Sequence, residues 1–271
     1  SDSEAKTALE LVKTSEIVVV FAGLPDAMES EGFDRKNMDL PKCQNRLINE
    51  ILKVNKNVVV VLHNGAPVVL PWRNDVSAVL EMYLGGQGVG EACDRILFGE
   101  ANPCGHLAET FPLKVEDTPC YTSFGGDGIT TDYAEGIFVG YRYYDKAGLK
   151  VRFPFGYGLS YTTYEYSDIS ADTRSARVTV RNSGKLAGDE IVQLYIGDER
   201  SSFTRPVKEL KGFRRVHLEP GESKVVEFAI TDEMLSSLDA SFRSVIEPGD
   251  FTVMIGPSSS DSELLKTKIT L

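Results

Sequence analysis

Two short runs of apolar residues most strongly limit what this chain can fold into. Residues 17–23 read Ile-Val-Val-Val-Phe-Ala-Gly, and residues 57–62 read Asn-Val-Val-Val-Val-Leu. Neither run alternates with polar residues, and a stretch with helical spacing separates them. Continuous apolar strands joined by helices are typical of a parallel sheet that is covered on both faces. The first half of the chain is therefore predicted to be an α/β domain.

Helices are predicted around these strands. Residues 4–15 place apolar side chains at helical spacing, and residues 39–52 continue such a stripe, with Asp39 expected to cap the helix. A third strand and helix flank the glycine-rich turn at 85–90. This turn is not predicted to bind a phosphate, because Glu91 stands where a dinucleotide loop needs a small residue and no Gly-Lys-Ser/Thr follows.

The second half has a different pattern. Residues 112–150 lose their periodicity and predict a long loop rich in aromatic residues, and short β runs broken by turns begin after residue 161. Examples of these β runs lie at 176–180, 190–196, 223–230 and 251–256. Short strands at this spacing predict an all-β sandwich. The fold class is therefore α/β with a mostly parallel sheet, followed by an immunoglobulin-like sandwich.

Composition excludes several classes of partner. The 29 basic and 40 acidic residues give a formal charge of −11, which repels phosphate backbones, so no nucleic acid is expected to bind. No apolar run is long enough to cross a bilayer. Residues 1–6 do not have the pattern of a signal peptide, although a signal peptide that had already been removed would not be visible in this sequence. No membrane partner is predicted.

The cysteines and histidines predict neither a metal site nor a cofactor. The four cysteines fall in the first half without Cys-x-x-Cys spacing, and the three histidines stand singly. Reduced thiols of a cytoplasmic protein are the favoured interpretation, with two disulfides as the open alternative.

One acidic residue is the candidate for catalysis. Glu31 follows the first apolar run, and open α/β sheets bind ligands just beyond the carboxyl ends of their strands. Glu29 and Glu31 are expected on the same side of an extended segment, and Gly32 lets a substrate approach the backbone. We predict that Glu31 is a catalytic acid, with Glu29 as the first alternative. An ordinary solvated acidic loop is the competing interpretation.

Several short motifs follow one another along the chain. They are Glu31-Gly-Phe-Asp-Arg, Met38-Asp-Leu-Pro, Asn64-Gly-Ala-Pro-Val, Trp72, Tyr83-Leu-Gly-Gly-Gln, Gly136-Ile-Phe-Val-Gly-Tyr-Arg-Tyr-Tyr, Phe153-Pro-Phe-Gly-Tyr-Gly-Leu-Ser-Tyr and Pro206-Val-Lys-Glu-Leu-Lys-Gly-Phe. In this order they resemble the C-terminal portion of a glycoside hydrolase family 3 β-glucosidase, and the resemblance covers essentially the whole chain. It implies a family 3 C-terminal α/β sandwich domain at 1–160, incomplete at its N-terminus, and a fibronectin type III-like domain at 161–271.

The resemblance also implies an activity and a missing partner. The complete protein is expected to be a retaining, exo-acting β-glucosidase that hydrolyses terminal β-D-glucosyl residues of β-linked glucosides or oligosaccharides. Glu31 is then its general acid/base, and the nucleophilic Asp lies on an N-terminal (β/α)8 barrel absent from this chain. Alone, the chain is expected to be inactive and to pair with the complementary barrel fragment or to form a homo-oligomer. The alternative is a non-catalytic carbohydrate-binding or scaffold module. No sugar-binding residue beyond Glu31 is predicted.

Overall fold

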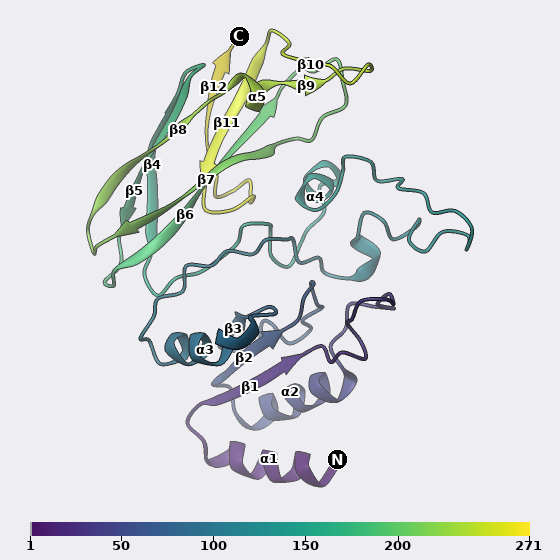
Figure 1. Cartoon of the computed structure of the whole chain (residues 1–271). Helices are drawn as coiled ribbons and strands as arrows, with labels where there is room; N and C mark the ends of the chain where they lie inside the picture. The colour runs from purple at the N-terminus through teal and green to yellow at the C-terminus, as the bar shows by residue number, and fades with distance from the viewer. Residues whose placement is uncertain (1) are drawn as a thin grey trace. The chain divides into compact units, whose positions relative to one another are not determined.

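The computed structural model describes residues 2–271, and these form two compact units (Figure 1). The first unit is the chain up to Phe98 together with Pro112–Glu116, and the second unit is Gly99–Phe111 together with Asp117–Leu271. The predicted domain boundary at 160/161 stays a prediction. No helix within residues 2–271 is long and apolar enough to cross a membrane.

The first unit is built on a parallel sheet, as predicted. Its strands β1 (Val18–Gly23), β2 (Val58–His63) and β3 (Ala78–Glu81) lie in the order β1-β2-β3. Its helices are α1 (Asp2–Thr14), α2 (Lys42–Val54) and α3 (Val89–Leu97), with the short 3-10 turn η1 (Gly86–Gly88) before α3. The central strand β2 is buried on both faces because helices and strands surround it, which explains its continuous apolar sequence.

The predicted cap of the second helix was wrong. Helix α2 has Pro41 at its N-cap, and no side chain caps it. The carbonyl of Pro41 instead accepts hydrogen bonds from the amides of Gln44 and Asn45, at 2.9 and 3.2 Å. Asp39 precedes the N-cap residue and does not cap the helix. Its backbone instead forms a β-bridge with Val69.

The second unit contains the all-β sandwich, as predicted. One sheet has the order β12-β11-β6-β7, and the other has the order β4-β5-β8 (Figure 1). The strands are β4 (Tyr164–Ala171), β5 (Ser175–Asn182), β6 (Gly188–Asp198), β7 (Glu209–Leu218), β8 (Ser223–Ala229), β11 (Asp250–Gly256) and β12 (Leu265–Thr270). A short helix α5 (Asp232–Leu235) and a small pair, β9 (Ser237–Leu238) and β10 (Ser244–Val245), complete it.

The segment at 112–150 is not one continuous loop. It contains the 3-10 turn η2 (Val115–Asp117) and the helix α4 (Tyr141–Ala147). Glycines bound this helix, because Gly140 has a φ of 54° and Gly148 a φ of 62°, which side-chain-bearing residues rarely adopt. The sequence pattern missed α4 because only one residue of this seven-residue helix, Tyr144, is buried.

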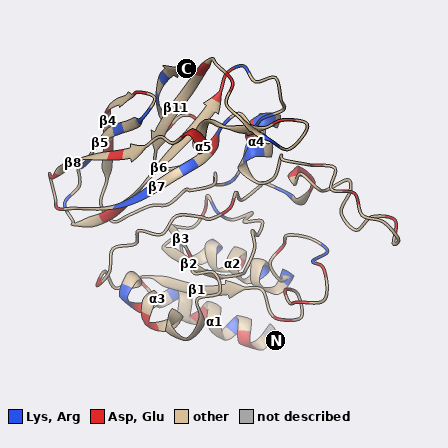
Figure 2. Cartoon of the chain, turned by 45° about the horizontal axis from the view of Figure 1, so that its top comes forward, with Lys and Arg blue, Asp and Glu red and all other residues tan. Residues whose placement is uncertain are grey.

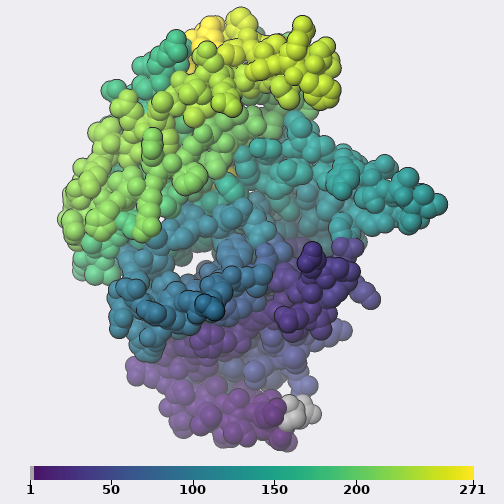
Figure 3. All heavy atoms as spheres, in the orientation of Figure 1, coloured from purple at the N-terminus to yellow at the C-terminus, as the bar shows by residue number. Residues whose placement is uncertain are grey.

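The stretch between η2 and α4 projects from the second unit as an extended loop (Figure 3). Three of its large apolar side chains are strongly exposed: Phe124 by 60%, Ile129 by 92% and Tyr133 by 82%. Acidic and basic residues both occur along the two units (Figure 2). Cys43, Cys93, Cys104 and Cys120 are free thiols. The cytoplasmic location inferred from them stays a prediction.

Candidate functional site

The loops that follow the three parallel strands start at the same edge of the sheet. Gly23 at the end of β1 is level with His63 of β2, and Leu62 is level with Glu81 at the end of β3. Residues that follow these positions are therefore neighbours in space although they are far apart in the sequence. This edge is where an open α/β sheet places its ligands.

The first loop leaves the sheet at a fixed point. A Cβ atom on Gly23 would collide with the carbonyl oxygen of His63, so only glycine fits this close approach of the two strands. The side-chain amide of Gln44 donates to the Gly23 carbonyl and accepts from the Gly23 amide, both at 3.0 Å. The amide of Leu24 then donates to the carbonyl of His63 at 3.0 Å.

Glu29 lies in the acidic turn, which we define as residues 27–35, and it is held by the next loop. Its Oε2 accepts a hydrogen bond from the backbone amide of Gly65 at 2.6 Å. Its Oε1 lies 3.7 Å from Nη1 of Arg35, and both side chains are 19% exposed. Nη1 of Arg35 also donates to the carbonyl of Pro67 at 3.2 Å.

Glu31 has a different environment. Its side chain is exposed, and among the described residues it makes no hydrogen bond or ion pair. The next residue, Gly32, has a φ of 92°, so the backbone turns there. The expectation that Glu29 and Glu31 share one side of an extended segment was wrong, because the acidic turn is bent at several points. The catalytic role of Glu31 stays a prediction.

A polar pair, Asn64 and Glu81, joins the second loop to the end of β3. Asn64 is fully buried, and its Nδ2 donates to Oε2 of Glu81 and to the carbonyl of Ala66, both at 3.1 Å. Oε1 of Glu81 accepts from the amide of Tyr83 at 2.8 Å. Tyr83 has a φ of 48°, a costly backbone conformation that tends to occur at functional sites. Sequence reasoning gave neither Asn64 nor Glu81 a role of its own, although Asn64 begins one of the motifs and directly follows a buried strand.

An apolar groove of about 370 Å³ lies in the first unit beside β1. Val19, Phe21, His63, Val89, Gly90, Cys93, Asp94, Leu97 and Phe98 line it. The ring of Phe21 stacks on that of His63 with 6.4 Å between centroids. Exposed apolar side chains at the edge of a sheet are typical of a surface that another structure covers, and Asp94 alone cannot provide a pair of catalytic carboxylates.

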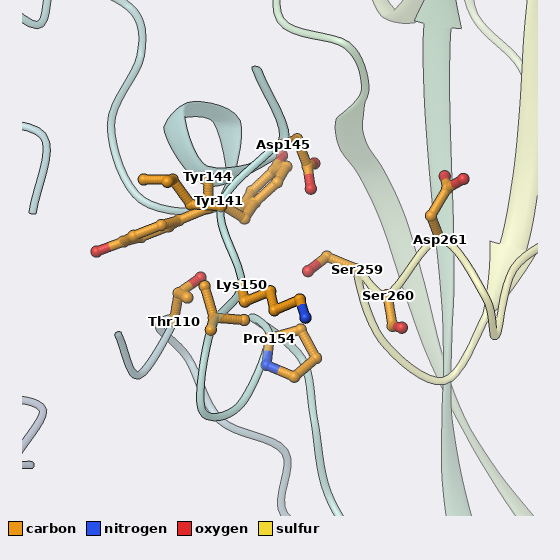
Figure 4. Close-up of a pocket in the computed structure, with 11 residues that line it drawn as sticks. Thr110, Tyr141, Tyr144, Asp145, Lys150, Pro154, Ser259, Ser260 and Asp261 are labelled. Atoms are coloured by element: carbon orange, nitrogen blue, oxygen red, sulfur yellow. The ribbon is translucent and has the colours of Figure 1, made fainter. Parts of the chain in front are cut away.

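The second unit has a separate cavity of about 390 Å³ next to α4 (Figure 4). Tyr144 in its wall is buried, which raises the pKa of its phenol to about 12. Lysines hold both carboxylates that line the cavity. Asp145 pairs with Lys208 and Asp261 pairs with Lys266, each at 2.7 Å. Because neither carboxylate is free, the cavity is a poorer candidate for acid/base chemistry than the loops of the parallel sheet.

Two stretches of the chain each match a known protein family. Residues 2–161 match the glycosyl hydrolase family 3 C-terminal domain, and residues 190–259 match the fibronectin type III-like domain. The chain belongs to glycosyl hydrolase family 3, and the resemblance inferred from the motifs is confirmed. No group of three or more His, Cys, Asp or Glu side chains within residues 2–271 is arranged to hold a metal ion.

The chain is similar to several β-glucosidases and to an arabinopyranosidase. Thermostable β-glucosidase B of Acetivibrio thermocellus is 51% identical over 96% of this chain, which covers 35% of that protein. Exo-α-(1→6)-L-arabinopyranosidase of Bifidobacterium breve is 40% identical over 94% of this chain and 34% of that protein. The crystal structure of the Kluyveromyces marxianus β-glucosidase in complex with glucose matches all of this chain and 33% of that one, with a TM-score of 0.94 and 41% identity. This chain therefore spans about a third of the length of these relatives.

Proposed function

We propose that this chain is the C-terminal part of a retaining, exo-acting β-glucosidase and that it supplies Glu31 as the general acid/base. The observation that carries the proposal is the position of Glu31. Its side chain lies exposed, without a partner among the described residues, in the Glu-Gly-Phe-Asp-Arg turn beyond the carboxyl edge of the parallel sheet. The β-glucosidase names of the relatives support the same activity.

In such an enzyme the two carboxyl groups act in two steps. An Asp on the N-terminal barrel attacks the anomeric carbon and forms a covalent glycosyl-enzyme, while Glu31 donates its proton to the departing glycosidic oxygen. Glu31 then takes a proton from a water molecule, whose oxygen attacks the anomeric carbon and releases both the sugar and the Asp. The two carboxyl groups must lie about 5–5.5 Å apart for this retaining mechanism. An exposed Glu31 leaves room for a substrate and for the second carboxylate.

Exposed apolar side chains on the edge strand of the first unit favour the presence of a partner that covers them. Val19 and Phe21 on the edge strand β1 are 40% and 61% exposed, and they line the apolar groove. An uncovered strand edge with apolar neighbours favours association with another chain or segment. We propose that the N-terminal part of the same enzyme covers this surface, and that without it a second copy of the chain does so. Alone, the chain should not hydrolyse aryl β-glucosides, and light scattering after size-exclusion chromatography should show self-association. An active monomer would contradict both statements.

The role of Glu31 is tested in the complete enzyme with Glu31→Ala. Poor leaving groups need protonation and activated aryl groups do not, so hydrolysis of unactivated β-glucosides should fall far more than hydrolysis of activated ones. Added azide should restore part of the turnover and yield a β-glucosyl azide. Equal losses on both substrates without an azide product would move the role to another residue, with Glu29 as the first alternative. A complete protein that binds sugar without any turnover would favour a carbohydrate-binding or scaffold module.

The sugar preference needs its own comparison. Because one relative is named an arabinopyranosidase, aryl β-D-glucoside and aryl α-L-arabinopyranoside should be assayed side by side. We expect the larger kcat/KM for the glucoside. The reverse order would keep the acid/base chemistry and change the substrate.

A further inference from the structure

We infer that Glu29 is a positioning residue, which holds the acidic turn in place so that Glu31 alone reacts. The inference rests on the role proposed for Glu31 and divides the work of the two glutamates by geometry. Glu29 lies two residues before Glu31, yet the surroundings of the two side chains differ completely.

Both carboxylate oxygens of Glu29 face protein donors. Oε2 accepts the Gly65 amide at 2.6 Å, and Oε1 lies 3.7 Å from the guanidinium of Arg35. The Glu29 side chain is 19% exposed, so it lies largely against the protein. A carboxylate whose two oxygens both face protein donors is a good anchor for a loop.

The acidic turn is anchored at both of its ends. Glu29 holds one end to Gly65, and Arg35 holds the other through the carbonyl of Pro67 at 3.2 Å. Both contacts are made to the same short loop after β2. The residues between these two contacts, Glu31 among them, are therefore confined to a small closed segment. The conformational entropy of this segment is lost when the chain folds, so ordering it adds nothing to the activation free energy of the reaction.

Gly65 fits this contact because it has no side chain. A Cβ atom there would lie 3.3 Å from the carboxyl carbon of Glu29 and 3.1 Å from Cδ1 of Leu84, which follows β3. All three loops at the carboxyl edge thus meet at this point. The substitution Gly65→Ala would therefore press on the Glu29 carboxylate. It disturbs the contact between Glu29 and Gly65 independently of a substitution at Glu29.

The first experiment follows the Gly65 amide in this chain by NMR and requires no enzymatic activity. In Glu29→Ala the Gly65 amide should lose its acceptor, shift upfield and exchange with solvent at least about tenfold faster, as expected for a lost hydrogen bond of this kind. Glu31→Ala and the exposed Asp26→Asn in the same loop are the matched controls, and neither should change the Gly65 amide. An unchanged Gly65 amide in Glu29→Ala would overturn the inference.

The second experiment measures the complete enzyme. Misplacing a catalytic group by about 1 Å can cost roughly a hundredfold, so Glu29→Ala and Gly65→Ala should lower kcat by about tenfold to a hundredfold with a smaller change in KM. The loss should be the same for activated and poor leaving groups, azide should give no glucosyl azide, and Glu29→Gln should recover much of the rate because its amide oxygen still accepts from Gly65. Loss confined to poor leaving groups and rescued by azide would make Glu29 the acid/base instead. If the enzyme hydrolyses no glycoside, the proposed function fails, and the Gly65 amide still decides whether the anchor exists.

Discussion

The parallel sheet of the first unit and the sandwich of the second bury their apolar residues in different ways. In the sandwich, Val178, Val192, Leu194 and Ile255 are fully buried in a core enclosed by two sheets. In the parallel sheet, Val58, Val60 and Val61 of the central strand are fully buried, but Phe21 on the edge strand is 61% exposed. The sandwich completes its own core, whereas the sheet leaves an apolar surface uncovered within the described residues.

The difference follows from how each sheet is connected. Antiparallel strands pair through short turns, so two sheets can close on one another within about a hundred residues. A parallel sheet depends on helices and further strands to cover its faces and edges, and these come from distant parts of the sequence. A folded region can therefore be self-sufficient or dependent on a partner, and substitutions in the two units should differ accordingly.

The largest effect is expected from breaking the ion pair between Lys208 and Asp145 in the second unit. Lys208 is 2% exposed and pairs with Asp145 of α4 at 2.7 Å, while burial raises the pKa of Asp145. Lys208→Met leaves that carboxylate without its partner and should lower the free energy of unfolding by about 3–5 kcal/mol. The loss should shrink at acidic pH, where Asp145 can be neutral. Urea denaturation measures it, with Lys208→Met/Asp145→Leu as the control that should regain most of the stability. Equal losses in the single and double variants would contradict this account.

The next effect tests whether the sandwich core is closed. Leu194 is fully buried between the two sheets, so Leu194→Ala should destabilise the second unit by about 3 kcal/mol through lost burial and the cavity left behind. Val225→Ala on β8, where the side chain is 66% exposed, is the matched control and should change little. A shift in the denaturation midpoint that is the same for both variants would show that the core is not closed as described.

A smaller effect on stability is expected at the uncovered sheet. Phe21→Ser should change the free energy of unfolding of this chain by less than about 1 kcal/mol, because the side chain is already largely in water. It should nevertheless reduce self-association measured by light scattering. Phe242→Ser removes an aromatic ring that is 84% exposed in the sandwich and should leave the association unchanged. Equal behaviour of the two variants would place the association surface elsewhere.

The smallest effect concerns an exposed charge cluster on the sandwich. A hydrogen bond to Asp189 at 2.7 Å, followed by the interaction with Glu219, raises the pKa of His217 above its usual 6.5. Its stabilising contribution is fully present below pH 6.5 and is lost as the pH rises through the raised pKa in the folded protein. His217→Asn should therefore flatten the pH dependence of the melting temperature in the range that begins at pH 6.5 and extends through the raised pKa of His217. Parallel profiles for the two proteins would rule out this contribution.

The sequence alone predicted the classes of both units because periodicity records local burial. The apolar runs of β1 and β2 predicted a parallel sheet, and the alternating runs predicted the sandwich. The edge strands β4, β7 and β12 were not among the examples named from the sequence, and in β7 and β12 lysines and arginines such as Lys211, Arg214 and Lys268 interrupt the apolar pattern. The motif order was sufficient to identify the family, and the position of Glu31 after the first strand was sufficient to nominate it.

Only the tertiary structure separated the two glutamates of the acidic turn. Glu29 contacts an amide 36 residues away, and Asn64 contacts a carboxylate 17 residues away. Both contacts exist because parallel strands in register bring their following loops to one edge of the sheet. Lys208 likewise pairs with a residue distant in the sequence, Asp145 of α4. Local patterns reflect which residues are buried, but which donor meets which acceptor depends on strand register and loop path, and these are properties of the folded chain as a whole.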